Sequence, residues 1–573
     1  MTRRRAAGAR AEQAPAPSRR TAPERQGGPD RGGASAKDPA GTRALARKAA
    51  QARQARRRSA ATRAGTALVA VSTLAAVVVV GARQAPAGAL RPAPAVTVPP
   101  AATVLTCPGP PELPAEVGGG GDAEFAPVPV APVTRLTAVA SDAAGTADLL
   151  GLDGTTVASG LASGAGATTV DVDAPGVVRA TAVTGATGAD TTWLAAATTM
   201  VTVTAGDLRG LSGASCQPAT ADQWLVGGAS DDGATAHLVL VNPGTTPARV
   251  TWTVWGTAGP VDLTSDQVLV APRSTEVVNL GAAAGPQQAL VTHVVASGGQ
   301  VAAWVQDSTI DGFTAAGTDL VVAGTPPATR QTVPGLLLDD SDLDATGGPT
   351  LRLLAPGDTD TTVRLTLFGA GGPVDLPGAG TLTLTAGTVL DVPLGGLPAD
   401  RYTAVVDADV PVLAAAAFPR VGQPGPLDPV PRTERALAAA TPGGTGVVAL
   451  PPDLTATLVV GAVGKGADAS QGPSGDGTVE VIGTAGQVLA THHLSVDAGT
   501  TGAWPVADLV PDVPASDIAA VSVVAADGAT LVWAVVVETV QADGTLVSLL
   551  TPIPPSGGPV VVTVRDDPTL GQG

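Results

Sequence analysis

Hydrophobic and polar residues follow two patterns along the chain, and the first is one long apolar run. Residues 64–82 carry no charge and lie between Arg63 and Arg83. An apolar stretch of about 20 residues is long enough, as a helix, to cross a hydrocarbon layer of roughly 30 Å. The pattern therefore predicts a transmembrane helix over residues 64–82.

The second pattern is a succession of short β-strands after this run. In residues 249–255, Val250, Trp252 and Val254 alternate with polar residues and would share one face of a strand. Val and Thr favour strands, whereas the 72 Gly and 51 Pro of the chain mark turns. The sequence predicts an all-β region.

A weak repeat organises this region. Two strand-forming runs joined by a Gly- or Asp-containing turn occur four times, and we interpret each pair as a hairpin. The paired runs are 177–183 with 193–196, 289–295 with 301–304, 402–406 with 412–415, and 518–524 with 531–534. Their aromatic residues Trp193, Trp304, Phe418 and Trp533 are 111, 114 and 115 residues apart. This register predicts core packing for the three tryptophans. About seven short strands per roughly 110 residues fit an immunoglobulin-like β-sandwich.

These patterns predict the following organisation of the chain. A disordered basic cytoplasmic tail (1–63) precedes the transmembrane helix (64–82) and a Pro-rich stalk (83–104). Four β-sandwich domains follow at 105–218, which a disulfide closes, and at 219–328, 329–435 and 436–555, before a C-terminal tail at 556–573.

Charge predicts the orientation in the membrane. The first 63 residues contain 17 basic and four acidic residues, whereas the chain after them contains 16 basic and 46 acidic residues. Lys and Arg that flank a transmembrane helix stay on the cytoplasmic side. The flanking residues Arg56, Arg57, Arg58 and Arg63 predict a cytoplasmic N-terminus and an extracytoplasmic C-terminal bulk, with membrane lipid contacted through one helix.

The alternative interpretation of the apolar run is a cleaved signal peptide. Val80, Gly81 and Ala82 are small or short residues at a suitable place for cleavage. Cleavage near Ala82 would release the protein as a secreted one. The basic leader is long for a signal peptide, so we favour the anchor.

Composition also restricts the partners. The tail has hardly any apolar side chain larger than Ala, so it cannot bury enough surface to fold alone. The acidic bulk predicts no binding of nucleic acid, which requires clustered Lys and Arg. Cell-wall polymer or other envelope proteins are the partners that we expect.

The chain has only two cysteines, Cys107 and Cys216. An even pair in a segment predicted to lie outside the cytoplasm predicts a disulfide. Neither residue has a second cysteine or a base nearby in sequence, as a redox or nucleophilic thiol would need.

Several motifs carry a family resemblance. They are Thr106-Cys107-Pro108-Gly109-Pro110, Ser215-Cys216-Gln217-Pro218, the segment 223–228 (QWLVGG) and the segment 238–244 (LVLVNPG). Together with the single apolar run they resemble an uncharacterised family of large membrane-anchored envelope proteins from high-GC Gram-positive bacteria. The resemblance implies location and architecture, and it transfers no catalytic residue.

The sequence offers little chemistry. His492 and His493 are adjacent and would point to opposite faces of a strand, and no nucleophile elbow, phosphate loop or zinc motif occurs. Residues 339–344 (DDSDLD) form the densest acidic cluster, for which we favour a solvated loop over a calcium site. We therefore predict no catalytic residue, no cofactor and no metal.

The function that the sequence favours is a noncatalytic structural, adhesive or scaffolding role in the cell envelope. Two alternatives come from other classes. One is an enzyme that acts on polysaccharide, or its accessory subunit, whose paired carboxylates would be brought together only by folding. The other is an envelope sensor that signals through its basic tail.

Overall fold

The fold is described from a computed structural model of the chain. It describes residues 68–77, 95–98, 102–111, 132–141, 144–161, 166–182, 193–343, 345–374, 376, 378–424, 429–464, 474–555 and 560–563. The chain divides into two compact units, Met1–Ala93 and Pro94–Gly573.

In the first unit the described residues, 68–77, form a helix. Its apolar side chains are exposed: Leu68, Val71 and Leu74 have 71%, 66% and 69% of their surface accessible. Nowhere in the described residues is there a helix both long and apolar enough for a membrane span. The remainder of the predicted transmembrane segment, and the flanking Arg56, Arg57, Arg58 and Arg63, lie outside the described residues.

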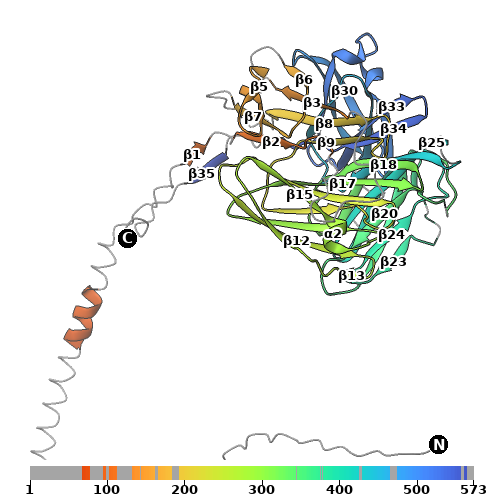
Figure 1. Cartoon of the computed structure of the whole chain (residues 1–573). Helices are drawn as coiled ribbons and strands as arrows, with labels where there is room; N and C mark the ends of the chain where they lie inside the picture. Colours follow the sequence, from red (N-terminus) through yellow and green to blue (C-terminus); the bar gives the residue numbers. More distant parts are fainter. Residues whose placement is uncertain are drawn as a thin grey trace, which may run out of the picture. The chain divides into compact units, whose positions relative to one another are not determined.

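The second unit consists of antiparallel sheets, which confirms the prediction of an all-β region. The described strands fall into four consecutive groups, and the same two-sheet strand order recurs in each group. Figure 1 shows the first group in orange, the second in yellow-green, the third in green to cyan and the fourth in blue.

The first group pairs its strands in the orders β2-β7-β4-β5 and β6-β3-β8-β9. These strands are β2 (Thr103–Cys107), β3 (Val133–Ala140), β4 (Ala144–Gly151), β5 (Thr156–Ala158), β6 (Ala167–Asp171), β7 (Gly176–Ala182), β8 (Ala195–Val203) and β9 (Gly210–Ser215).

The second group has the orders β10-β16-β12-β13, with β14 on β12, and β15-β11-β17-β18. Its strands are β10 (Asp222–Val226), β11 (Ala234–Asn242), β12 (Ala248–Gly256), β13 (Gly259–Pro260), β14 (Gln267–Val270), β15 (Ser274–Asn279), β16 (Val291–Ser297), β17 (Ala302–Asp311) and β18 (Thr314–Val321), with the short helix α2 (Leu280–Ala284).

In the third group one strand, β25 (Asp400–Pro424), serves both sheets. Its first half pairs with β19 and β21, and its second half pairs with β20 and β26. The other strands are β19 (Ala328–Leu338), β20 (Thr350–Leu354), β21 (Thr361–Gly369), β22 (Gly372–Val374), β23 (Thr381–Leu384), β24 (Val389–Pro393) and β26 (Pro431–Ala439).

The fourth group has the orders β27-β32-β29-β30 and β31-β28-β33-β34. Its elements are β27 (Gly446–Ala449), β28 (Thr455–Ala462), β29 (Gly475–Gly483), β30 (Val488–Val496), β31 (Thr500–Pro505), η2 (Val506–Leu509), η3 (Ala515–Asp517), β32 (Ile518–Ala525), β33 (Leu531–Gln541) and β34 (Gly544–Leu550).

The structure corrects the four predicted hairpins. The two runs of each predicted hairpin lie in opposite sheets: β7 pairs with β2 and β4, whereas β8 pairs with β3 and β9. β16 and β17, and β32 and β33, are separated in the same way, and β25 runs on without a break. A turn residue marks a bend, but it does not determine whether the chain re-enters the same sheet. The hairpins observed at this place are β8–β9, β17–β18, β25–β26 and β33–β34.

The repeated tryptophans pack as predicted, and Phe418 packs in the same way. Trp304, Phe418 and Trp533 are fully buried in β17, β25 and β33, and Trp193 is half-buried against the core of the first group. The core clusters cross group boundaries: one contains Leu136 of the first group together with Ala520 of the fourth. The four groups are therefore not independent domains, because each contributes residues to a hydrophobic cluster that it shares with another group.

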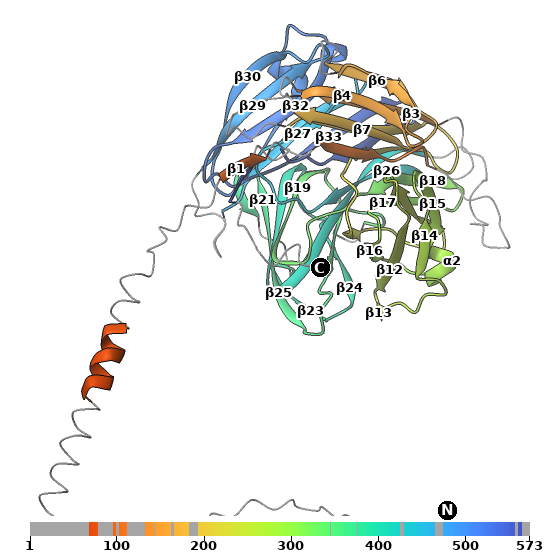
Figure 2. The same cartoon turned by 90° about the vertical axis from the view of Figure 1, so that its left-hand side faces the viewer.

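A two-stranded sheet closes the second unit at its chain ends. β1 (Ala95–Val98) pairs antiparallel with β35 (Val560–Thr563), which brings part of the predicted stalk beside part of the predicted C-terminal tail. The first and fourth groups lie side by side in both views, next to this sheet (Figures 1 and 2).

Candidate functional site

The four groups meet through their equivalent edge strands, β9, β18, β26 and β34. β9 contacts β18, β18 contacts β26, β26 contacts β34, and β34 contacts β9, so the four strands form a closed ring of contacts. Figure 2 shows β18 and β26 side by side beneath strands of the first group. We call the polar residues gathered here the central junction: Arg209, Gly213, Asp307, Asp319, Glu434, Arg435, Asp543 and Ser548.

Asp319 of β18 connects all four groups. Its Oδ1 accepts hydrogen bonds from the Gly213 backbone N–H (3.2 Å) and from the Ser548 hydroxyl (2.9 Å). Its Oδ2 accepts one from the Leu437 backbone N–H at 2.9 Å. The donors belong to the first, fourth and third groups, while the carboxylate belongs to the second. Asp319 is 1% exposed, so these bonds lie in the interior.

Arg209, just before β9, adds a second connection between the first and fourth groups. Its Nε and Nη2 donate to the two carboxylate oxygens of Asp543, each at 2.9 Å. This two-pronged geometry fixes orientation as well as distance. The Arg209 side chain is only 3% exposed. Between the third and second groups, Arg435 Nη2 lies 2.5 Å from Asp307 Oδ2.

Glu434 of β26 is a second buried carboxyl of the central junction. Its Oε1 accepts a hydrogen bond from the Leu211 backbone N–H at 3.3 Å. Its Oε2 accepts none from a described residue and lies 3.9 Å from Arg209 Nη1. Because Arg209 is already engaged with Asp543, burial dominates and raises the pKa of the Glu434 carboxyl well above its usual range.

Burial acts in the same direction on Asp319. It raises the pKa of this carboxyl to about 7, although its hydrogen bonds favour the charged form. Asp543 behaves oppositely, because the hydrogen bonds from Arg209 lower its pKa. The central junction thus holds two carboxyls that favour the proton and one that favours the charge.

The raised pKa of Asp319 predicts how folding stability depends on pH. A carboxyl that binds its proton more tightly in the folded state contributes stability that is fully present below the unfolded pKa near 3.8 and lost as pH rises through about 7. Between pH 4 and 7 we expect this contribution to fall by roughly 1 kcal/mol per pH unit. Urea unfolding of the parent and of Asp319→Asn would measure it as a difference between the two proteins that changes with pH. A difference that is constant from pH 5 to 8 contradicts the prediction.

Glycine lets these strands approach each other. A Cβ at Gly213 would lie 2.7 Å from Met200 Cε and 2.8 Å from the Ser548 oxygen. Overpacking of this kind costs about 1–3 kcal/mol. We predict that Gly213→Ala destabilises the protein by this amount, measured as a lower urea midpoint. Gly371→Ala, where a Cβ would meet nothing within 4 Å, is the control and should leave the midpoint within about 0.5 kcal/mol of the parent.

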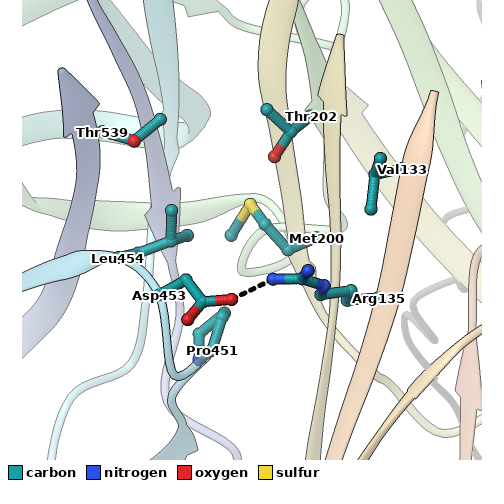
Figure 3. Close-up of a pocket in the computed structure, with 8 residues that line it drawn as sticks. All are labelled: Val133, Arg135, Met200, Thr202, Pro451, Asp453, Leu454 and Thr539. Carbon is teal, nitrogen blue, oxygen red and sulfur yellow. Dashed lines mark hydrogen bonds and ion pairs between the residues drawn. The ribbon is translucent and has the colours of Figure 1, made fainter. Parts of the chain in front are cut away.

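A pocket lies where the first and fourth groups adjoin, and we call it the side pocket. Its volume is about 210 Å³, and Figure 3 shows its lining. Strands β3 and β8 form one wall, and the segment before β28 together with β33 forms the other. It is lined by Val133, Arg135, Met200, Thr202, Pro451, Asp453, Leu454 and Thr539.

An ion pair crosses the side pocket. Arg135 Nη1 donates to Asp453 Oδ2 (Figure 3). Arg135 Nε lies 3.4 Å from Asp171 Oδ1. Met200 is 3% exposed and forms part of the apolar floor of the pocket. Thr202 and Thr539 are half-buried, and their hydroxyls are further polar groups of the lining. The pocket therefore combines an apolar floor with polar groups that can bind a ligand.

The structure confirms the predicted disulfide between Cys107 and Cys216. Both cysteines are buried, and the bond joins the end of β2 to the residue after β9. It therefore connects the two sheets of the first group at the sequence ends of that group.

The predicted acidic cluster does not gather around a common point in the described residues. Asp340 accepts a hydrogen bond from the Ala399 N–H at 2.7 Å, and Asp339 lies 3.5 Å from Arg420. Asp344 lies outside the described residues. Within the described ranges, no three His, Cys, Asp or Glu side chains form a group that could hold a metal ion.

Two tryptophans and a histidine stack in the second group. The ring centroids of Trp224 and Trp255 are 5.3 Å apart, and Trp224 stacks on His293 at 3.9 Å. Trp255 is only 8% exposed and packs against residues of the third group, including Leu413. Trp255 therefore packs between groups and does not form an open binding platform.

Sequence reasoning did not find the central junction or the side pocket. Arg135 and Asp453, which meet in the pocket, are 318 residues apart. The available signal was local: Asp319 interrupts a strand whose other residues are small or uncharged. Such a charge, placed where no solvent face is expected, marks a buried polar contact.

Antiparallel sheets joined at a buried polar centre place the second unit in the all-β class of proteins. The sequence pattern of a family of unknown function, DUF5719, matches residues 171–507. The chain belongs to this family. No curated protein matches the chain. The resemblance to an uncharacterised family is thereby supported, while its membrane and organism components stay predictions.

Proposed function

We propose that the protein is a noncatalytic structural, adhesive or scaffolding component of the cell envelope, displayed outside the cell on a membrane anchor. The observation that carries this proposal is the central junction. One buried carboxylate receives a hydrogen bond from each of the other three groups, so the groups act as one stiff body. A stiff body with fixed faces suits display and spacing better than a reaction that requires groups to open and close.

The anchor is supported by sequence and by exposure. The apolar run over residues 64–82 follows the basic tail, as the positive-inside rule expects of a cytoplasmic flank. In the described part of the run, Val69 and Val77 expose 63% and 69% of their surface, as side chains that contact lipid would. We further infer that the four groups are immunoglobulin-like sandwiches, because each has two antiparallel sheets with one recurring strand order.

The distribution of lysines allows a direct test of topology. The chain has three lysines: Lys37 and Lys48 lie before the apolar run, and Lys465 lies after it. Intact cells are treated with an amine reagent that cannot cross the membrane, and the full-length protein is then analysed by mass spectrometry. We expect label on Lys465 and none on Lys37 or Lys48, with complete labelling of all three after lysis as the control.

Two results would decide against the proposed display. Label on Lys37 and Lys48 but not on Lys465 would reverse the orientation. Loss of peptides before Ala82, with the protein in the medium, would replace the anchor by secretion. A second measurement concerns the role itself. The protein should sediment with isolated cell wall or crosslink to envelope proteins, and failure of both contradicts a structural or adhesive role.

A further inference from the structure

The side pocket has the chemistry of a binding site for a neutral, hydroxyl-rich ligand. Its rim carries one cation, Arg135, already shared between Asp453 and Asp171. The local charge is therefore not positive, which disfavours an anionic ligand. Hydroxyl groups that both donate and accept would satisfy the remaining hydrogen-bonding positions of the guanidinium and of the Asp453 carboxylate.

The two threonines extend this polar rim to the opposite side of the pocket. Thr202 lies on β8 and Thr539 on β33, so the first and fourth groups contribute one hydroxyl each. Figure 3 places both above Met200, across the pocket from the Arg135–Asp453 pair. A ligand ring would be contacted at its edge from both sides, while its C–H face would rest on the floor.

The floor of the side pocket is apolar and can pack against the C–H face of a ligand ring. Met200, Pro451 and Leu454 provide an apolar surface, and the flexible thioether of Met200 adapts to irregular shapes. The volume of about 210 Å³ is smaller than the roughly 300–1,000 Å³ of pockets that hold drug-sized ligands. It therefore accommodates one ring and not a chain of rings.

We propose that the side pocket binds a single uncharged sugar unit of a glycan. This proposal extends the proposed function by naming a class of partner. It rests on the proposed function only for the extracytoplasmic location, where the protein would contact the glycan. With few polar contacts and no aromatic side chain among the described lining residues, the affinity for one unit is expected to be weak, with a Kd of about 1 mM. Useful attachment would then come from many anchored copies contacting one polymer.

The test is saturation-transfer NMR on the full-length protein in mild detergent. The probes are the methyl glycosides of glucose, galactose, mannose and arabinose, each examined alone. We expect transfer to at least one probe. The double variant Thr202→Val, Thr539→Val, which keeps side-chain shape but removes both hydroxyls, should weaken binding about tenfold. Thr362→Val, Thr383→Val removes two exposed, directly opposed hydroxyls in the third group and should bind as the parent does.

A second variant keeps the test decisive if the first does not fold. Leu454→Trp fills the pocket without removing either hydroxyl, and it should abolish transfer while circular dichroism stays unchanged. No transfer to any probe overturns the proposal, as does transfer that survives both pocket variants. Displacement of the sugar by sodium acetate overturns the assignment to a neutral ligand.

The failure of this proposal can be separated from failure of the proposed function. Binding is measured on purified protein, so it does not depend on where the lysines are labelled in cells. Methanol released from a methyl glycoside would show hydrolysis, which would contradict the noncatalytic role but leave sugar binding in place. Wall attachment without transfer would leave the structural role in place and overturn the sugar site.

Discussion

Replacing Asp319 by Ala should destabilise the second unit by at least about 3 kcal/mol. The change leaves three donors without their acceptor: the N–H groups of Gly213 and Leu437 and the Ser548 hydroxyl. The bonds from Gly213 and Ser548 are buried and the one from Leu437 is half-buried, and each buried donor left unpaired costs about 1–3 kcal/mol. The urea midpoint of unfolding, read by tryptophan fluorescence, measures the effect. The control is Asp262→Ala, an exposed aspartate of the same group, which should stay within about 0.5 kcal/mol of the parent.

Equal stability of Asp319→Ala and Asp262→Ala would show that the hydrogen bonds to Asp319 do not hold the groups together. The variant Ser548→Ala tests how the stabilisation is divided among the three hydrogen bonds to Asp319. If Ser548→Ala costs as much as Asp319→Ala, the Ser548 hydroxyl alone carries the effect, and the contacts of Asp319 with the first and third groups contribute nothing.

Removal of the disulfide is the second large effect that we expect. The bond joins residues 109 positions apart, and closing a loop of about 100 residues stabilises a fold by up to about 4.7 kcal/mol in the chain-entropy model. We predict that Cys107→Ala, Cys216→Ala lowers stability by about 2–5 kcal/mol. Unfolding is measured by urea titration with and without reductant.

The variant itself provides the control for the disulfide. Reductant should lower the midpoint of the parent towards that of Cys107→Ala, Cys216→Ala and should leave the variant unchanged. A parent that is as stable with the bond reduced as with it formed would contradict the prediction. It would mean that the contacts between the first and fourth groups already hold the ends of the first group.

Local sequence patterns predicted a good part of the fold. Alternation around Trp252 identified a half-buried strand, and the register of Trp304 and Trp533 identified core positions. These succeed because burial of one strand face is encoded within a few residues. The pairing of strands was predicted wrongly. The runs around Val291 and Trp304 were assigned to one hairpin, but they lie in two different sheets. Neighbours in sequence share a turn, whereas sheet partners are chosen by long-range packing.

The contacts between groups could not be predicted from the sequence. Arg209 and Asp543 are 334 residues apart, and nothing in either local sequence specifies the other. The same holds for Arg135 and Asp453, which create the side pocket only after the first and fourth groups adjoin. A repeat of about 110 residues suggests independent domains, but it does not say how their surfaces associate.

The region that matches the family contains only part of the central junction. The match over residues 171–507 spans the whole of the second and third groups and ends within the fourth. It contains Arg209, Asp319 and Glu434, but not Asp543 or Ser548. The junction is therefore shared between the matched region and the chain that follows it.

Hydrogen exchange measured by mass spectrometry tests the central claim, that Asp319 joins four groups into one body. The comparison is between the parent and Asp319→Ala at one pH, read in peptides covering β9, β18, β26 and β34. We predict faster exchange in all four strands of the variant, because each loses its link to the same carboxylate. Faster exchange confined to β18, with β9, β26 and β34 as protected as in the parent, would contradict the claim.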